Sequence, residues 1–174
     1  PSGLFLSHAR QPVSGTCVTI ALEGRRALPV EVQALIVKSQ APQPRRVVNG
    51  VDASRVAMLL AVLERRAGIP LSTFDVYVST VGGIRVTEPG ADLAIALAIA
   101  SAYKDKAFSA TMAVVGEISL AGEIRPASSA KQRRAEAARL GFSTVLDSDA
   151  AHVREALRLA FASATDERVQ IPEF

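Results

Sequence analysis

Alternating apolar and polar positions predict β-strands in the first half of the chain. Two runs rich in apolar and β-branched residues, 16–22 and 27–37, flank the charged turn sequence Glu23-Gly24-Arg25-Arg26. A connection this short favours antiparallel pairing of the two runs. Phe74–Thr80 alternates in the same way and is followed by Gly82-Gly83, which predicts the end of a third strand.

Apolar residues at helical spacing predict four helices, each with a start or stop signal in the sequence. The expected ranges are 52–67 with Asp52 or Ser54 as cap, 93–102 after a turn at Pro89-Gly90, 128–140 with Ser128 or Ser129 as cap, and 150–162. Between the second and third helices, the runs 112–118 and 123–124 predict a hairpin across a glycine-containing turn. A further short strand is expected at Thr144–Leu146.

Strands and helices alternate irregularly, which predicts an α/β fold of the α+β type, with helices packed on a mixed sheet. The 174 residues, 49% of them hydrophobic, suffice for one core and fit a single domain. The longest apolar run, 93–102, is too short to span a bilayer, and we expect no secretory signal. Cys17 is the only cysteine, so no disulfide forms within the chain, and a cytoplasmic location is expected.

The turn at Pro89-Gly90 has the composition of a helix start that can hold an anion or activate a nucleophile. Pro89 suits the first position of a helix, Gly90 permits close backbone approach, and Asp92 complements the positive end of the helix dipole. No Ser, Cys or Thr follows the proline, however. We therefore expect no catalytic residue in this turn.

The order of these elements resembles the proteolytic domain of the Lon family, in which a turn reading Pro-Ser-Ala-Gly precedes a helix of small residues. Here the turn reads Pro89-Gly90-Ala91-Asp92, and it is followed by Gly116-Glu117-Ile118 and, after Pro126, by Lys131. Gly90 stands where the resemblance places the nucleophilic serine, and Lys131 stands at the position of the Lon lysine. The resemblance implies a Lon-like fold in which only the lysine of the Ser-Lys pair persists.

Several further segments resemble one family in the same order. They are Pro29-Val30-Glu31-Val32-Gln33-Ala34-Leu35, Pro44-Arg45-Arg46, Gly82-Gly83-Ile84-Arg85-Val86, Glu88-Pro89-x-Ala91-Asp92-Leu93-Ala94 and Ala137-Ala138-Arg139-Leu140-Gly141-Phe142. The family is that of the bacterial RadA (Sms) DNA repair and recombination proteins, and the similar part is its carboxy-terminal Lon-like domain. This resemblance implies a non-proteolytic scaffold that supports duplex DNA binding and hexamer assembly of a DNA-dependent ATPase acting in recombination and branch migration.

The same resemblance implies a division of the chain and a set of cofactors. Residues 1–15 are expected to be a linker from an ATPase core, 16–163 the Lon-like domain, and 164–174 a carboxy-terminal tail. ATP, Mg and Zn are expected in amino-terminal parts outside this sequence, and no cofactor is expected in the domain itself.

Arginine doublets and a net charge of +3 favour a polyanionic partner. Arg45-Arg46 follows a loop predicted by two prolines in 40–44, Arg85 follows Gly82-Gly83, and Arg125 precedes Pro126. In a Lon-like arrangement we expect Arg45, Arg46, Arg85 and Arg125 to form one surface on the phosphate backbone of duplex or branched DNA. Aromatic residues make up only 5% of the chain, which disfavours base stacking on single strands.

Two other functions remain open at this point. The first alternative is a Ser-Lys peptidase that pairs Lys131 with an unrecognised serine, and the second is a pure oligomerisation domain without direct DNA contact. The serines available for such a role are Ser79, Ser101, Ser128 and Ser129. His8 and His152 lie far apart in the sequence without cysteines or acidic clusters at ligand spacing, so no metal site is expected.

Overall fold

The computed structural model describes residues 12–164. The predicted domain 16–163 lies within this range, whereas most of the predicted linker, nearly all of the predicted tail and His8 lie outside the described residues. Within residues 12–164, no helix is long and apolar enough to cross a membrane.

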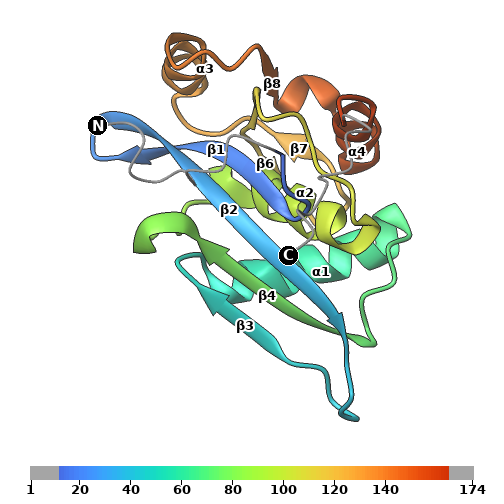
Figure 1. Ribbon diagram of the computed structural model, residues 1–174. Helices are drawn as coiled ribbons and strands as arrows, with labels where there is room; N and C mark the ends of the chain where they lie inside the picture. Colours follow the sequence, from blue (N-terminus) through green and yellow to red (C-terminus); the bar gives the residue numbers. More distant parts are fainter. Residues whose placement is uncertain (1–11, 165–174) are drawn as a thin grey trace, which may run out of the picture.

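A six-stranded mixed sheet forms the centre of the domain, which confirms the predicted fold class (Figure 1). In spatial order its strands are β3 (Arg46–Asn49), β4 (Phe74–Thr80), β2 (Arg26–Lys38), β1 (Thr16–Glu23), β5 (Met112–Val114) and β8 (Thr144–Leu146). The pairs β1–β2 and β2–β4 are antiparallel, and the other three pairs are parallel. The antiparallel pairing predicted for the first two runs is therefore present, and β1 and β2 form a hairpin with Glu23 paired to Arg26 at its tip.

Four α-helices pack on this sheet, near the predicted positions. They are α1 (Ala53–Ala67), α2 (Asp92–Lys104), α3 (Ala130–Arg139) and α4 (Val153–Ala162). Three short 3-10 helices occur as well, η1 (Val81–Gly83), η2 (Pro89–Ala91) and η3 (Ser148–Ala150). Figure 1 shows α1 and α2 behind the sheet, and α3 at the other side near β1.

The predicted hairpin over 112–118 and 123–124 is only partly correct. The first run divides into β5, which joins the main sheet, and β6 (Glu117–Ile118), which pairs with β7 (Ile124–Arg125) in a separate two-stranded ribbon. Gly116 is the point of division, because its N–H donates to Gly90 O at 3.0 Å and its carbonyl accepts from Leu93 N at 3.0 Å. These bonds direct the chain out of the sheet and against the start of α2.

The helix starts show which capping predictions were sound. Asp52 caps α1 as expected: its Oδ1 accepts from the N–H groups of Ser54 and Arg55, at 2.9 and 3.1 Å. Its hydrogen bonds, first that from the Ser54 hydroxyl, lower the pKa of this carboxyl. Ser129 precedes α3 but has φ 53° and no side-chain cap bond. The last helix begins at Val153 rather than at 150, because His152 Nδ1 accepts from Arg154 N at 3.1 Å and serves as its cap.

Helix α2 is enclosed on all sides. Ten consecutive residues from Asp92 to Ser101 are buried, and most are Ala, Leu or Ile. The sheet covers one side of the helix, and α1 and α4 cover others. The small alanine side chains allow this close approach, which explains why the sequence shows an almost uninterrupted apolar run instead of an amphipathic stripe.

A buried ion pair joins the start of α2 to α1. The fully buried carboxylate of Asp92 accepts from Arg55 Nε at 2.7 Å and from Arg55 Nη2 at 2.5 Å. Its Oδ2 also accepts the backbone N–H of Ile118 at 3.0 Å, which fixes β6 at the same point. Hydrogen bonding to Asp92 raises the pKa of the Arg55 guanidinium above its usual value.

The two faces of the sheet are covered to different extents. Helices α1, α2 and α4 pack on one face, where the main core lies. On the other face, α3 packs on β1 and on the start of β2, next to a small cluster around Ile20, Ala113 and Ala137. The part of this face formed by β2, β4 and β3 carries the exposed side chains of Leu35, Val37 and Val47.

Candidate functional site

The turn before α2 places Gly90 in the interior of the domain. Residues 89–91 form η2, in which Pro89 occupies a first-turn position and Gly90 and Ala91 are buried. Backbone bonds to Gly116 hold the turn against the end of β5. This is the place where the Lon resemblance puts a nucleophilic side chain.

A side chain at Gly90 would be crowded by three neighbouring side chains. A Cβ atom built on Gly90 would lie 3.0 Å from the Cβ of Ala127, 3.1 Å from Glu88 Oε1 and 3.2 Å from Arg133 Nη1. Contacts this short require the neighbouring atoms to move. The space is therefore already filled, chiefly by the side chains of Glu88 and Arg133.

Arg133 is the centre of a buried polar network at this place. Its side chain comes from α3, the residue is 1% exposed, and its Nη1 forms an ion pair with Glu88. Three further hydrogen bonds fix the guanidinium: Nε donates to Ser128 O at 2.7 Å, Nη1 to Ile20 O at 3.0 Å, and Nη2 to Ser128 Oγ at 3.1 Å. Glu88 Oε2 in turn accepts from Leu22 N at 3.3 Å. The network joins β1, η2 and α3 and leaves at most one guanidinium N–H for any other partner.

The basic residue that faces Gly90 is thus Arg133, whereas Lys131 lies exposed on α3. The sequence analysis identified Lys131 and missed Arg133. A signal was available, because Arg133 and Ala137 are four residues apart and share the buried face of the helix. An arginine on such a face requires acceptors, and Glu88 in the turn provides one.

Three of the four candidate serines, Ser79, Ser101 and Ser128, form hydrogen bonds within the fold. The hydroxyl of the buried Ser101 donates to Lys106 O at 2.5 Å and accepts from Gly15 N, so it connects three segments of chain. The Ser128 hydroxyl accepts from Arg133, and the Ser79 hydroxyl donates to Thr80 O. These contacts support structural roles for the serines.

The thiol of Cys17 and the imidazole of His152 are both held within the fold. Cys17 is buried, and burial raises the pKa of its thiol far above the range in which it would ionise. The described part of the chain contains no group of three or more His, Cys, Asp or Glu side chains that could hold a metal ion. The His152 ring is engaged at both nitrogens, since Nε2 also lies 3.0 Å from Ala121 O.

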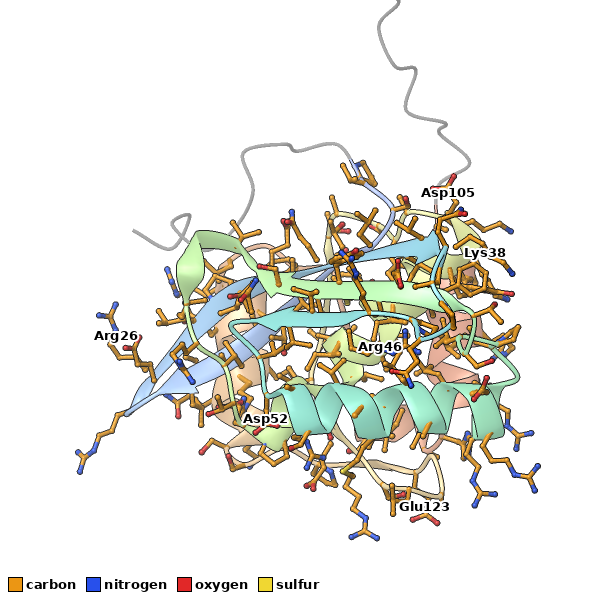
Figure 2. The ribbon with its side chains drawn as sticks, turned by 90° about the horizontal axis from the view of Figure 1, so that it is seen from below. Arg26, Lys38, Arg46, Asp52, Asp105 and Glu123 are labelled. Atoms are coloured by element: carbon orange, nitrogen blue, oxygen red, sulfur yellow. The ribbon has the colours of Figure 1, made fainter. Side chains whose placement is uncertain are left out.

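The structure separates the four arginines of the predicted DNA surface into two groups. Arg45 and Arg46 lie where β3 begins, and Arg85 lies beyond its other end, where Val86 bridges to Val51. The five steps from Arg46 to Val51 span about 16 Å at roughly 3.3 Å per residue. Figure 2 shows Arg46 between β3 and α1, where its guanidinium donates to the carbonyls of Phe74 and Leu71.

Arg85 and Arg125 both flank the Gly90 turn. Arg85 precedes Glu88 by three residues, and Arg125 precedes Ala127, the neighbour of Gly90, by two. The tip of the β1–β2 hairpin reaches the same end of the molecule, because Gln132 Nε2 donates to Arg25 O at 2.5 Å. Figure 2 shows Arg26 projecting from this tip. The exposed cations on these segments are called the basic end: Arg25, Arg26, Arg85, Arg125 and Lys131.

Comparison with known proteins adds two findings. The family described as subunit ChlI of Mg-chelatase matches residues 64–150. The chain is 50% identical over 146 residues to DNA repair protein RadA of Mycolicibacterium smegmatis, covering 84% of this chain and 31% of that protein. It is 46% identical over 142 residues to DNA repair protein RadA of Escherichia coli, covering 82% and 31%. The corresponding values for DNA repair protein RadA of Synechocystis sp. are 47%, 84% and 29%, so the chain spans less than a third of these relatives.

The Arg133 network predicts a strong difference between two basic residues of α3. Changing Arg133→Met should lower the free energy of unfolding by roughly 2 kcal/mol, because it leaves Glu88 and two carbonyls without their partner. The matched change Lys131→Met, on the exposed side of the same helix, should alter it by less than about 0.5 kcal/mol. Urea unfolding followed by circular dichroism measures both values, and equal stability of the two variants would contradict the network.

Proposed function

Because the chain belongs to the RadA family of bacterial DNA repair proteins, we propose that it is a non-catalytic domain that holds duplex or branched DNA and supports assembly of a larger protein. The observation that carries this proposal is the set of side chains that surrounds Gly90. The turn is filled internally by an ion pair and bordered externally by the exposed cations of the basic end.

The surroundings of Gly90 support the proposal that the domain is not a peptidase. A Ser-Lys peptidase needs a hydroxyl whose proton passes to a neutral lysine, and a cavity that admits a peptide. Gly90 has no side chain, and the base facing it is a guanidinium, which stays protonated at any physiological pH. The Glu88–Arg133 ion pair thus supports a structural role for this turn.

The basic end suits the sequence-independent binding of a nucleic acid backbone. Its five cations come from a hairpin tip, a loop, a short strand and a helix start, so folding alone brings them together. None belongs to an arrangement of helix or strand that enters a DNA groove, which supports phosphate contacts over base recognition. Arg45 and Arg46, at the far end of β3, are proposed as a second contact along the same duplex.

We further propose a hexamer for the complete protein. A closed ring repeats one heterologous contact, and such contacts use exposed apolar side chains. Met58 on α1 and Leu120 in the β6–β7 turn are exposed to 37% and 65% and offer such groups.

The cofactors of the complete protein are proposed to bind outside this domain. The sequence has no Gly-x-x-x-x-Gly-Lys-[Ser/Thr] loop for ATP and Mg²⁺ and has a single cysteine, which is too few for a zinc ribbon. The residues present do not fit these groups, and no step of the proposed function uses them. A cytoplasmic location is proposed as well, consistent with the one buried thiol.

A serine-reactive fluorophosphonate should not label the domain. The variant Gly90→Ser should also remain unlabelled, because its hydroxyl would meet the Glu88–Arg133 ion pair and find no neutral base. Mass spectrometry after incubation, with an active serine hydrolase as positive control, measures labelling. A single modified serine in the unaltered protein would establish the peptidase alternative.

Binding of labelled duplex DNA should depend steeply on salt. The double variant Arg85→Ala/Arg125→Ala should weaken binding of all sequences alike and reduce the magnitude of the log–log salt slope by about two, at roughly 0.9 per lost phosphate contact. A matched control removes the two exposed arginines Arg65 and Arg66 at the last turn of α1, and its slope should not change.

Two results of the same titration would contradict parts of the proposal. If Arg45→Ala/Arg46→Ala reduced the slope while Arg85→Ala/Arg125→Ala did not, DNA would be held at the opposite end of β3. If no variant changed affinity or slope, the domain would serve oligomerisation alone.

Light scattering of the complete protein, with and without nucleotide and DNA, should give the mass of six chains. The reason is the closed-ring geometry that one repeated contact produces. A strict monomer under all of these conditions would contradict the assembly proposal.

A further inference from the structure

The edge strand β3 lies between two hollows, one on each face of the sheet. β3 is the last strand on its side of the six-stranded sheet and pairs with β4. Arg46 and Val48 line a groove of about 290 Å³ on the side of α1. Val47 and Asn49 line a second groove, of about 360 Å³, on the outer face. Successive side chains of β3 thus face opposite hollows, as would those of a strand added beside it.

Two residues of β3 direct their backbone hydrogen-bonding groups away from the sheet. In the parallel pairing with β4, Arg46 lies opposite Val76, and Val76 N donates to Arg45 O at 2.9 Å. In such a ladder the N–H and C=O groups of alternate residues point to the same side, so those of residues 45, 47 and 49 face β4. The N–H and C=O groups of Arg46 and Val48 therefore point outward. An unpaired edge of this kind can accept a further strand.

Helix α1 forms the floor of the inner groove and runs alongside β3 (Figure 2). Ala53, Ala57 and Ala61 recur every four residues on the side that lines the groove, and all three are exposed. Val56 and Leu60 lie between them and are buried. The alanines are spaced by about 6 Å along the helix, close to the roughly 6.6 Å between side chains on one face of a strand. The floor therefore leaves room for the inward side chains of an added strand.

The charge available within this groove is that of a carboxylate. The Arg46 guanidinium donates to the carbonyls of Phe74 and Leu71, whereas Glu64 is an exposed residue of the groove lining. A carboxylate repels a phosphate backbone and attracts a lysine or an arginine. The groove therefore suits an extended peptide with apolar side chains at alternate positions and a basic residue at one end.

We propose that the edge of β3 binds such a peptide of a partner protein as an added strand. The peptide backbone pairs with the outward N–H and C=O groups of Arg46 and Val48. The inward side chains of the peptide pack over Ala57 and Leu60, and its basic residue faces Glu64. This contact uses neither the turn before α2 nor the basic end, so it is independent of DNA binding there.

Selection of random heptapeptides displayed on phage, with the 174-residue chain as the target, tests this contact. The enriched peptides should alternate apolar and polar residues, carry a lysine or arginine at one end and contain no proline. Val48→Pro should weaken their binding at least about tenfold, because it removes an outward N–H and no hydrogen bond of the β3–β4 ladder. Val48→Ile keeps this N–H and is the matched control, which should bind the peptides as the unaltered chain does.

A second pair of variants tests the groove itself. Ala57→Trp fills the space above α1 and should abolish peptide binding. Ala135→Trp, at an exposed alanine of α3, should leave binding unchanged. Glu64→Gln should weaken binding of a basic peptide to the level of the same peptide with glutamine in place of its basic residue.

The opposite results would overturn the proposal. No strand-like peptide is then enriched, or the enriched peptides bind Val48→Pro as well as they bind Val48→Ile. Equal binding to Ala57→Trp and Ala135→Trp would place the peptide outside the groove. A loss of duplex DNA affinity in Ala57→Trp without any enriched peptide would assign the groove to nucleic acid. Circular dichroism shows which variants are folded, and Ala57→Trp, made at an exposed position, keeps the test decisive if the proline variant is not.

Discussion

The arrangement of the domain depends on the hydrogen bonds and the ion pair that the buried carboxylate of Asp92 forms. It is fully buried at the start of α2, and three N–H donors from α1 and β6 converge on it. A buried charge is tolerated only when its partners are held in place, so this one residue requires α1, α2 and the β6–β7 ribbon to adopt a fixed mutual orientation. Because α2 also lies against the sheet, the position of the Gly90 turn follows from the same constraint.

The second buried ion pair, Arg133 with Glu88, fills the space beside Gly90. A guanidinium with four of its donors engaged cannot accept a proton, and its bulk occupies the space that a substrate would need. The pair also connects β1 to α3, the one helix on the outer face.

Local patterns in the sequence predicted the elements well, and contacts between distant residues explain what was missed. The β1–β2 hairpin, the cap at Asp52 and the enclosed α2 each depend on neighbouring residues, so alternation, capping and apolar runs reveal them. The partners of Arg133, at Ile20 and Glu88, are 113 and 45 positions away, and no local rule identifies them. The same reason explains the division of 112–118 at Gly116 and the separation of Arg46 from Arg85.

The pairing of β1 with β5 has a consequence for how the domain folds. β1, β2, β3, β4 and α1 come from the first half of the chain, but Val18 must find Ala113 before β5 and β8 can extend the sheet. Such a parallel pairing closes a long loop, which costs chain entropy before any contact repays it. Until it forms, the apolar surface of α2 has only part of its cover. The late step in folding is therefore expected to be the closure of β5 onto β1, which completes the cover of α2.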